Sequence, residues 1–463
     1  MPRVTRRRFL KTAGLGVSAM ALSDKSPAVV RGSRPNVVFI LTDDQRLDTI
    51  AALGNPRIRT PNLDRLAKTG FVFNRAYCMG SQINAVCMPS RTQILTGMSQ
   101  FRAKDAPSGT DPGRYTFPRA MKEAGYATMR TGKFGNHPAM ICAEFDRYIQ
   151  IRRHTTCTEE HTNNGIQFIR ENAGKRAFFL LLAYAAPHDP QPAPQDYRDL
   201  YRAEDMALSP NFLPFHPFDI GEPPGRDELT LAWPRTRENV SGKMARYYAS
   251  ITYTDAQIGR ILDVLGETGQ AGNTLVVFAS DNGLSLGDHG LLGKQNLYES
   301  GGMHVPLLFA GPGIPAGSTD ALVYLFDVYP TVCDFAGIPV PMRIDGRSLS
   351  PIIHGLKKRI RDTVFCAYKD IQRSLRDDRW KLYRYPKINK TQLFDLQNDL
   401  HEMRNLADDP AHAERVRKMT TLLVEAQEQF DDTAPLSSES PSRAEADLEY
   451  YLKFNPRVDP ISQ

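Results

Sequence analysis

Apolar residues along this chain gather in short continuous runs that alternate with longer amphipathic stretches. Three runs, 36–41, 178–183 and 274–280, are almost wholly apolar, as expected for central strands of a parallel sheet, which are buried on both faces. The stretches 117–124 and 243–265 instead have the spacing of amphipathic helices. The alternation predicts an α/β fold: a large mixed, mostly parallel sheet sandwiched by helices.

The pattern changes at two places. Residues 190–240 are rich in proline, charge and aromatics and poor in periodicity, which predicts a long excursion from the sheet. Short alternating strands followed by a helix at about 411–430 predict a C-terminal α+β subdomain with a short antiparallel sheet. The excursion contains several residues that either recognise a substrate or pack against the core: His216, Asp219, Arg226, Asp227, Trp233 and Arg235. The predicted units are 1–31, 32–360, 361–435 and a polar tail at 436–463.

Composition and charge limit the classes of function that the chain can have. With 463 residues and 41% hydrophobic content, the chain can bury a large core. The formal net charge of +6 comes entirely from residues 1–31, which hold seven basic residues and one acidic residue. Since the rest of the chain is formally neutral, we expect no nucleic acid among its partners.

The basic N-terminal segment has the organisation of an export signal. Arg6-Arg7-Arg8 precedes Phe9-Leu10-Lys11, as in twin-arginine signals, and the weakly apolar run 12–22 follows. That run is too short to span a bilayer. Residues 1–31 are therefore predicted to be a twin-arginine signal peptide read by the twin-arginine export machinery. The mature protein is expected to be periplasmic or secreted in a bacterium, without a membrane span.

The cysteines do not form a metal-binding pattern. The sequence has six of them and no C-x-x-C pair, which argues against a zinc cluster. Cys142 and Cys157 are close enough in sequence to close a disulfide in an oxidising compartment, whereas free buried thiols are expected for most of the others.

Acidic and amide side chains follow two of the apolar runs. Asp43 and Asp44 come after the first run, and Asp281 and Asn282 come directly after Ser280. The carboxyl ends of parallel strands meet at one edge of a sheet, where ligands bind. Two adjacent aspartates repel each other unless a cation lies between them, although a surface turn would also explain the first pair alone. A hard cation is therefore predicted, with calcium preferred over magnesium or manganese.

The segment from Cys87 to Gly97 carries the most specific pattern in the chain. Pro89 favours a helix that starts at Cys87, where backbone N–H groups and the helix dipole favour negative charge. Arg91 lies one turn further on and can hold an anion. A buried cysteine at a helix start is the simpler alternative. However, the eleven residues fill every fixed position of C-x-P-S-R-x-x-x-L-T-G, and the chain thereby resembles the sulfatase family.

The resemblance continues in order along residues 34–350. Its further segments are the strand 36–44 with its paired aspartates, Pro187-His188-x-Pro190, Ser280-Asp281-Asn282-Gly283, Gly287-x-His289-Gly290, and Gly293-Lys294 with Tyr298-Glu299. Residues 393–406 resemble the small C-terminal module of the same family. The resemblance implies an alkaline-phosphatase-like version of the predicted α/β fold and a sulfuric ester hydrolase.

The resemblance also implies cofactors and roles. A formylglycine-generating maturation enzyme would oxidise Cys87 to formylglycine, whose hydrated aldehyde attacks sulfur with Asp281 as proton acceptor. His188 would protonate the departing sugar oxygen, helped by Lys294. The implied calcium ligands are Asp43, Asp44, Cys87, Asp281 and Asn282. The implied catalytic residues are Cys87, Arg91, Lys133, His137, His188 and Lys294, with Arg91, Lys133 and Lys294 binding the sulfuryl oxygens.

One motif departs from the family pattern. The family has Gly-Lys-x-His, whereas Gly132-Lys133 is here followed by Phe134-Gly135-Asn136-His137, which places the histidine four residues after the lysine. The role of Lys133 transfers directly. His137 serves as the base of the last step if the insertion bulges; otherwise Asn136 or another histidine takes this role.

Export and the excursion at 190–240 favour a sulfated carbohydrate as substrate. A phosphonate or phosphodiester hydrolase of the same superfamily is the alternative enzyme. A non-catalytic binder of sulfated glycans is the alternative if Cys87 stays unmodified.

Overall fold

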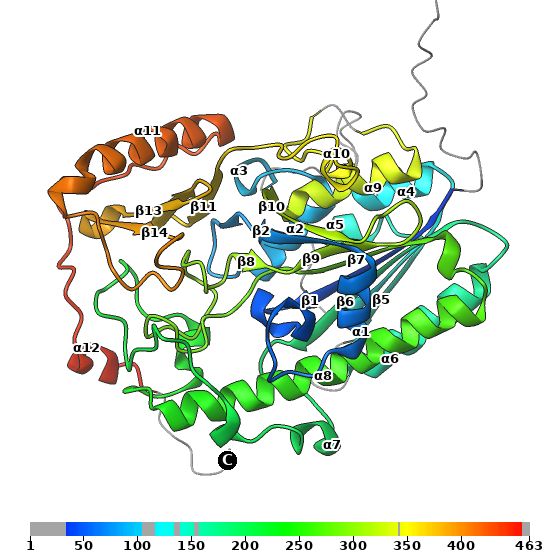
Figure 1. The fold of residues 1–463 in the computed structure, drawn as a ribbon, viewed down its shortest axis with the longest axis horizontal. Coiled ribbons are helices and arrows are strands. Elements are labelled where there is room, and N and C mark those ends of the chain that lie inside the picture. The colour runs from blue at the N-terminus through cyan, green and yellow to red at the C-terminus, as the bar shows by residue number, and fades with distance from the viewer. Residues whose placement is uncertain (1–33, 104–115, 134–138, 152–156, 341–342, 456–463) are drawn as a thin grey trace, which may run out of the picture. The chain divides into compact units, whose positions relative to one another are not determined.

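The computed structural model describes residues 34–103, 116–133, 139–151, 157–340 and 343–455 (Figure 1). The predicted signal peptide and His137 therefore lie outside the described residues. Within the described residues, no helix combines the length and the apolar character needed to cross a membrane.

The three apolar runs form adjacent central strands of the large sheet. β1 (Asn36–Asp43) lies between β6 (Phe178–Pro187) and β7 (Thr274–Ser280), and both pairings are parallel. The order of the sheet is β10-β2-β9-β7-β1-β6-β4-β5, with β8 paired to β2. Antiparallel pairs occur only around β8 and β9 among the described strands of this sheet. The predicted mixed, mostly parallel α/β fold is confirmed.

The remaining strands of this sheet extend it on both sides. They are β2 (Phe71–Tyr77), β4 (Ala127–Lys133), β5 (Arg147–Ile151), β8 (His304–Val305), β9 (Leu307–Ala310) and β10 (Gly317–Tyr324).

Successive side chains of β1 point to opposite faces of the sheet, and helices cover both faces. Val38 and Ile40 pack in one cluster with α1 (Pro61–Thr69), α6 (Cys157–Asn172) and α8 (Arg237–Glu267). Val37, Phe39 and Leu41 pack in another cluster with α2 (Cys87–Thr96), α4 (Phe117–Glu123) and α9 (Val328–Ala336). Figure 1 shows α6 and α8 running along one side of the strands. Burial on both faces explains why these strands are continuously apolar in sequence.

A second sheet contains the predicted antiparallel strands and one short strand from far upstream. β11 (Val364–Tyr368), β12 (Gln372–Arg376), β13 (Trp380–Tyr385) and β14 (Lys390–Asp395) pair antiparallel in chain order. β3 (Gly80–Ser81) joins β11 in parallel. α11 (Ala413–Phe430) packs with the core of this sheet, over which it lies in Figure 1. Because β3 ends six residues before α2 begins, the second sheet is connected directly to the segment that carries Cys87.

The excursion at 190–240 and the polar tail pack against each other. Phe218 forms an isolated bridge with Glu445, and the ring of Trp233 stacks on Tyr451 of α12 (Leu448–Leu452) at 5.2 Å between centroids. All six cysteines are buried free thiols, so the disulfide between Cys142 and Cys157 is not formed. The other described α-helices are α3 (Gln100–Ala103), α5 (Ala139–Cys142), α7 (Gln195–Arg198) and α10 (Ser350–Ile353).

Candidate active site

Four neighbouring parallel strands deliver polar side chains to the same edge of the large sheet. Asp43 ends β1, Lys133 ends β4, His188 follows β6, and Asp281 with Asn282 follows β7. These strands are adjacent in the order β7-β1-β6-β4, so their carboxyl ends form one crevice. α2 brings Cys87 to this edge.

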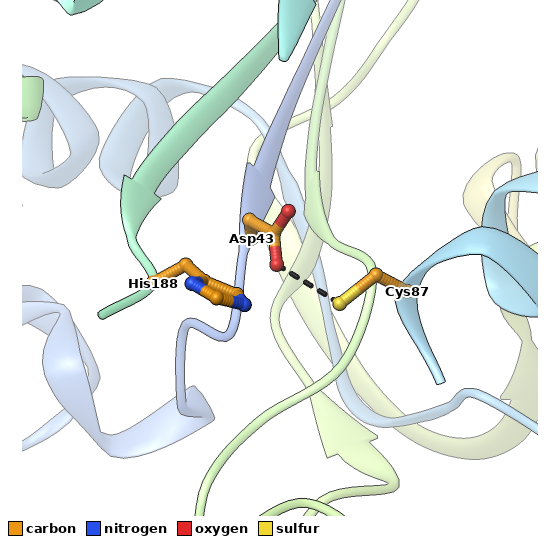
Figure 2. A group of neighbouring side chains, drawn as sticks. All are labelled: Asp43, Cys87 and His188. Atoms are coloured by element: carbon orange, nitrogen blue, oxygen red, sulfur yellow. Dashed lines mark hydrogen bonds between the residues drawn. The ribbon is translucent and has the colours of Figure 1, made fainter. Parts of the chain in front are cut away.

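The Cys87 thiol lies among charged groups. Its Sγ is 3.0 Å from Oδ1 of Asp43, 3.6 Å from Oδ1 of Asp44 and 3.0 Å from Nζ of Lys294. Figure 2 shows Asp43 between Cys87 and His188. Burial raises the pKa of the Cys87 thiol well above its ordinary value, and the negative charge of Asp43 adds to this effect. This setting disfavours the thiolate, which is the form in which a cysteine acts as a nucleophile.

Several oxygen atoms around Cys87 fit a divalent cation. One ligand atom each from Asp43, Asp44, Cys87 and Asp281 lie within 4.8 Å of one another. Oδ2 of Asp44 and Oδ1 of Asn282 are buried and have no hydrogen-bond partner among the described residues. Leaving a buried acceptor unsatisfied costs about 1–3 kcal/mol, and more if it is charged. A hard cation bound by these oxygens would satisfy both, so the residues present fit calcium.

The acidity of Asp281 shows the same crowding of negative charge. Burial and the charge of Asp43 raise the pKa of the Asp281 carboxyl to about 7. For Asp43 itself, burial alone would raise the pKa, but the charges of Lys133 and Arg91 outweigh it and hold the pKa well below its ordinary value. Within one cluster, Asp43 thus ionises more readily than Asp281, although Arg91 contacts both carboxyls.

Three cationic side chains line the buried part of the site. The Arg91 guanidinium donates through Nε to Oδ2 of Asp281 at 2.7 Å and through Nη2 to Oδ2 of Asp43 at 2.9 Å. Lys133 Nζ donates to Oδ2 of Asp43 at 3.0 Å, and Lys294 Nζ donates to Oδ1 of Asp44 at 2.6 Å. Arg91 is wholly buried. These three groups can bind oxygens of an anionic substrate beside Cys87.

Tyr247 of α8 holds the backbone of Asp44. Asp44 has a φ of 70°, a left-handed conformation that is costly for a residue with a side chain. The Tyr247 hydroxyl donates to the Asp44 carbonyl at 2.5 Å and accepts the Arg46 N–H at 2.9 Å. The sequence predicts only that Tyr247 belongs to the amphipathic helix expected at 243–265. Its contact with the turn after β1 is a tertiary feature with no motif to reveal it.

His188 is oriented by its own neighbour. Its Nδ1 is 2.8 Å from the carbonyl oxygen of Asp189, which fixes Nδ1 as the donor and turns Nε2 toward the site. Nε2 lies 3.8 Å from Oδ2 of Asp44. It is also 3.1 Å from Nη2 of Arg226, which belongs to the excursion.

Only part of the excursion reaches this site. Arg226 and Asp227 begin the 3-10 helix η4 (Arg226–Thr230). Asp227 accepts hydrogen bonds from Nε of Arg226 at 2.9 Å and from Gln295, and its Oδ2 is 3.9 Å from Nζ of Lys294. Burial opposes ionisation of Asp227, but Lys294 and Arg226 lower the pKa of its carboxyl to about 2. The excursion residues His216, Trp233 and Arg235 are buried away from these contacts, packing against Phe218, Tyr451 and Glu228 respectively.

The structure therefore brings together every predicted site residue except His137, which lies outside the described residues. It adds three residues that the motifs do not include: Arg226, Asp227 and Tyr247. For Arg226 and Asp227, the only sequence signal is their presence in an irregular polar segment.

Comparison with known proteins gives two family matches. A family model described as Sulfatase matches residues 35–338, and one described as N-sulphoglucosamine sulphohydrolase, C-terminal, matches residues 287–429. The chain is 28% identical to an arylsulfatase of Clostridium perfringens, with 84% of this chain and 94% of the relative covered. It is 26% identical to an N-acetylglucosamine-6-O-sulfatase of Bacteroides thetaiotaomicron, with 92% of each covered.

Solved structures match over most of the chain as well. One, in complex with its substrate D-glucosamine-2-N,6-O-disulfate, has a TM-score of 0.73 at 23% identity and covers 88% of this chain and 100% of its own. A phosphonate monoester hydrolase of Agrobacterium radiobacter has a TM-score of 0.70 at 22% identity, covering 86% of this chain and 96% of its own. At these identities the two structures establish the fold alone.

Proposed function

Because the chain belongs to the sulfatase family and is a sulfuric ester hydrolase, we propose that it removes sulfate from a carbohydrate, using formylglycine made from Cys87 and a bound calcium ion. The observation that carries the proposal is the setting of Cys87. Its sulfur touches Asp43, Asp44 and Lys294 in a buried cluster whose free oxygens fit a cation. A thiol with a strongly raised pKa has no evident use there, whereas an oxygen nucleophile does.

Formylglycine and calcium would supply different parts of the chemistry. Formylglycine supplies a hydrated aldehyde as nucleophile, and calcium supplies positive charge that favours an oxygen anion. Asp43, Asp44, Asp281, Asn282 and residue 87 are the proposed calcium ligands.

Arg91, Lys133 and Lys294 are proposed to bind the sulfuryl oxygens. Each is buried beside Cys87 or its carboxylate neighbours and carries N–H donors into the site. Preorganised donors of this kind stabilise charge that develops in a transition state, typically by about 3–4 kcal/mol each. Asp281, whose Oδ2 already accepts from Arg91, is the proposed acceptor of the proton of the nucleophile.

His188 is proposed to protonate the departing sugar oxygen, assisted by Lys294. Its Nε2 faces the site because Nδ1 is held by the Asp189 carbonyl. In the structure Nε2 accepts an N–H from Arg226, a hydrogen bond that is lost when Nε2 carries the proton. His137 remains the proposed base of the last step, with Asn136 or another histidine as the alternative.

The names of similar proteins support a carbohydrate substrate. One relative is an N-acetylglucosamine-6-O-sulfatase, and one similar structure holds a disulfated glucosamine as its substrate. The excursion reaches His188 through Arg226, whose side chain is exposed and could meet a sugar. We also propose that residues 1–31 direct export through the twin-arginine machinery to the periplasm or the medium, and that a formylglycine-generating enzyme is the maturation partner.

A phosphonate or phosphodiester hydrolase is the second candidate, favoured by the structural likeness to phosphonate monoester hydrolases. The test is to produce the protein with a formylglycine-generating enzyme and compare turnover of 4-nitrophenyl sulfate with that of 4-nitrophenyl phenylphosphonate. We expect the sulfate to be the better substrate. A preference for the phosphonate would replace the proposal with the second candidate.

Mass spectrometry of the peptide containing Cys87 tests the nucleophile. The expected product has the thiol replaced by an aldehyde, with a corresponding loss of mass. A plain thiol in protein from the native host, together with binding of sulfated glycan without turnover, would indicate a non-catalytic binder.

A further inference from the structure

We propose that Arg226 binds a second anionic group of the substrate, distinct from the sulfate ester that is hydrolysed, and so makes the enzyme selective for sugars with two negative charges. The inference rests on the proposed function, because it requires the hydrolysed sulfate to lie at Cys87. The proposed ligand binds where the excursion reaches the site, at Arg226 and Asp227.

Arg226 differs from the other cations of the site in exposure and in partners. Its side chain is 65% exposed, whereas those of Lys294 and Lys133 are 4% and 10% exposed. The buried cations donate directly to Asp43, Asp44 or Asp281. Arg226 donates to none of these three carboxylates, and its described partners are Asp227 and His188.

Asp227 holds the guanidinium of Arg226 in place. Both Nε and Nη2 of Arg226 donate to Oδ1 of Asp227, which is itself almost wholly buried. The other oxygen of Asp227 accepts from Gln295 at 2.8 Å. An arginine clamped along one edge has already lost much of its side-chain freedom, so a ligand that binds the opposite edge loses little more.

The opposite edge of the guanidinium is available for a ligand. Nη1 of Arg226 makes no hydrogen bond to any residue that the structure describes. Its two N–H groups and the exposed side chain suit an anionic oxygen of a carboxylate or a sulfate. The nearby acids of the excursion do not compete for it, because Glu222 pairs with Lys369 and Glu228 with Arg235.

The position of His188 places this ligand on the sugar side of the ester. Nε2 of His188 lies 3.8 Å from Oδ2 of Asp44 and 3.1 Å from Nη2 of Arg226. Arg226 thus contacts the imidazole that is proposed to meet the departing oxygen, and it donates to none of the carboxylates beside Cys87. An anion held by Arg226 therefore belongs to the leaving sugar and not to the sulfate under attack.

The test measures sugars as competitors of 4-nitrophenyl sulfate turnover, so that cleavage of the sugar itself is not required. One pair is N-acetylglucosamine 6-sulfate and glucosamine N,6-disulfate, which differ by one negative charge. A second pair is a neutral hexose 2-sulfate and the matching uronate 2-sulfate. The variants are Arg226→Met and Arg226→Lys. Arg202→Met is the matched control, since Arg202 lies in the same excursion, is 66% exposed and also pairs with nearby acids.

In the wild type, we expect the doubly charged member of at least one pair to inhibit at about tenfold lower concentration than its singly charged partner. Arg226→Met should reduce this ratio about fivefold or more, Arg226→Lys should keep part of it, and Arg202→Met should keep all of it. Melting temperatures of the variants show whether each is folded.

An inhibition ratio near one for both pairs in the wild type, or an unchanged ratio in Arg226→Met, would overturn the inference. Equal weakening of both members of a pair by Arg226→Met would also overturn it, because Arg226 would then position His188 or Asp227 without binding a second charge. Absence of 4-nitrophenyl sulfate turnover in the matured wild type is a separate result, which would reject the proposed function itself.

Discussion

Replacing Tyr247 by phenylalanine should weaken calcium binding through the backbone of Asp44. The change removes one hydroxyl from the buried face of α8 without opening a large cavity. That hydroxyl donates to the Asp44 carbonyl at 2.5 Å and accepts the Arg46 N–H at 2.9 Å. Both backbone groups border the left-handed turn at Asp44, whose φ is 70°. The hydroxyl therefore stabilises a strained turn that presents a proposed calcium ligand.

The size of the effect follows from the two lost hydrogen bonds. Each buried backbone group left without a partner costs about 1–3 kcal/mol, so the loss of both hydrogen bonds should lower the free energy of unfolding by about 2–6 kcal/mol. With an unfolding entropy of about 2.1 cal/mol/K per residue, a chain of this size loses about 1 °C per kcal/mol. We therefore expect a melting temperature lower by about 2–6 °C. If about 1.4 kcal/mol of this loss falls on the calcium-bound state alone, the calcium affinity drops about tenfold.

The assay is thermal unfolding across a calcium titration, in which the dissociation constant is read from the rise in stability with free calcium. Tyr248→Phe is the matched control. Tyr248 is the next residue of the same helix, and its hydroxyl accepts from Asn55 at 2.9 Å and does not contact Asp44. Equal effects of the two substitutions, or an unchanged calcium affinity in Tyr247→Phe, would refute the reasoning.

Three other predictions concern the reaction and the cation. Cys87→Ala should abolish turnover while changing the melting temperature by only about 1–2 °C, because the side chain is small. A large drop in melting temperature would show that Cys87 also supports the fold. His188→Ala should slow hydrolysis of a sugar sulfate about 100-fold but hydrolysis of 4-nitrophenyl sulfate much less, because nitrophenolate departs without a proton. Equal losses of rate for both esters would show that His188 is not the general acid. Removing calcium with a chelator should lower both turnover and melting temperature, because Asp43, Asp44 and Asp281 repel one another without a cation. Added calcium should restore both. If the chelator changes neither turnover nor melting temperature, the result argues against a calcium site.

Local sequence was sufficient to predict the central strands and most of the site. β1, β6 and β7 are recognisable because burial on both faces demands continuous apolar runs. Asp43 and Asp281 were predicted to meet because parallel strands end at one edge. The segment from Cys87 contains a helix start, the position of the nucleophile and a cation within eleven residues. Its function can therefore be predicted without knowledge of distant contacts.

The tertiary structure alone decided which residues from other segments complete the site. Arg226 and Asp227 lie in a stretch without periodicity. Only the folded protein shows that Arg226 contacts His188 and that Asp227 contacts Gln295, which places both residues beside the candidate active site. Tyr247 reaches the turn after β1 from the middle of a long helix, and β3 pairs with a strand almost three hundred residues further along the chain. Hydrophobic periodicity reports only which face of an element is buried. The partner that a buried or exposed polar group meets depends on how distant segments pack, and that information exists only in the folded protein.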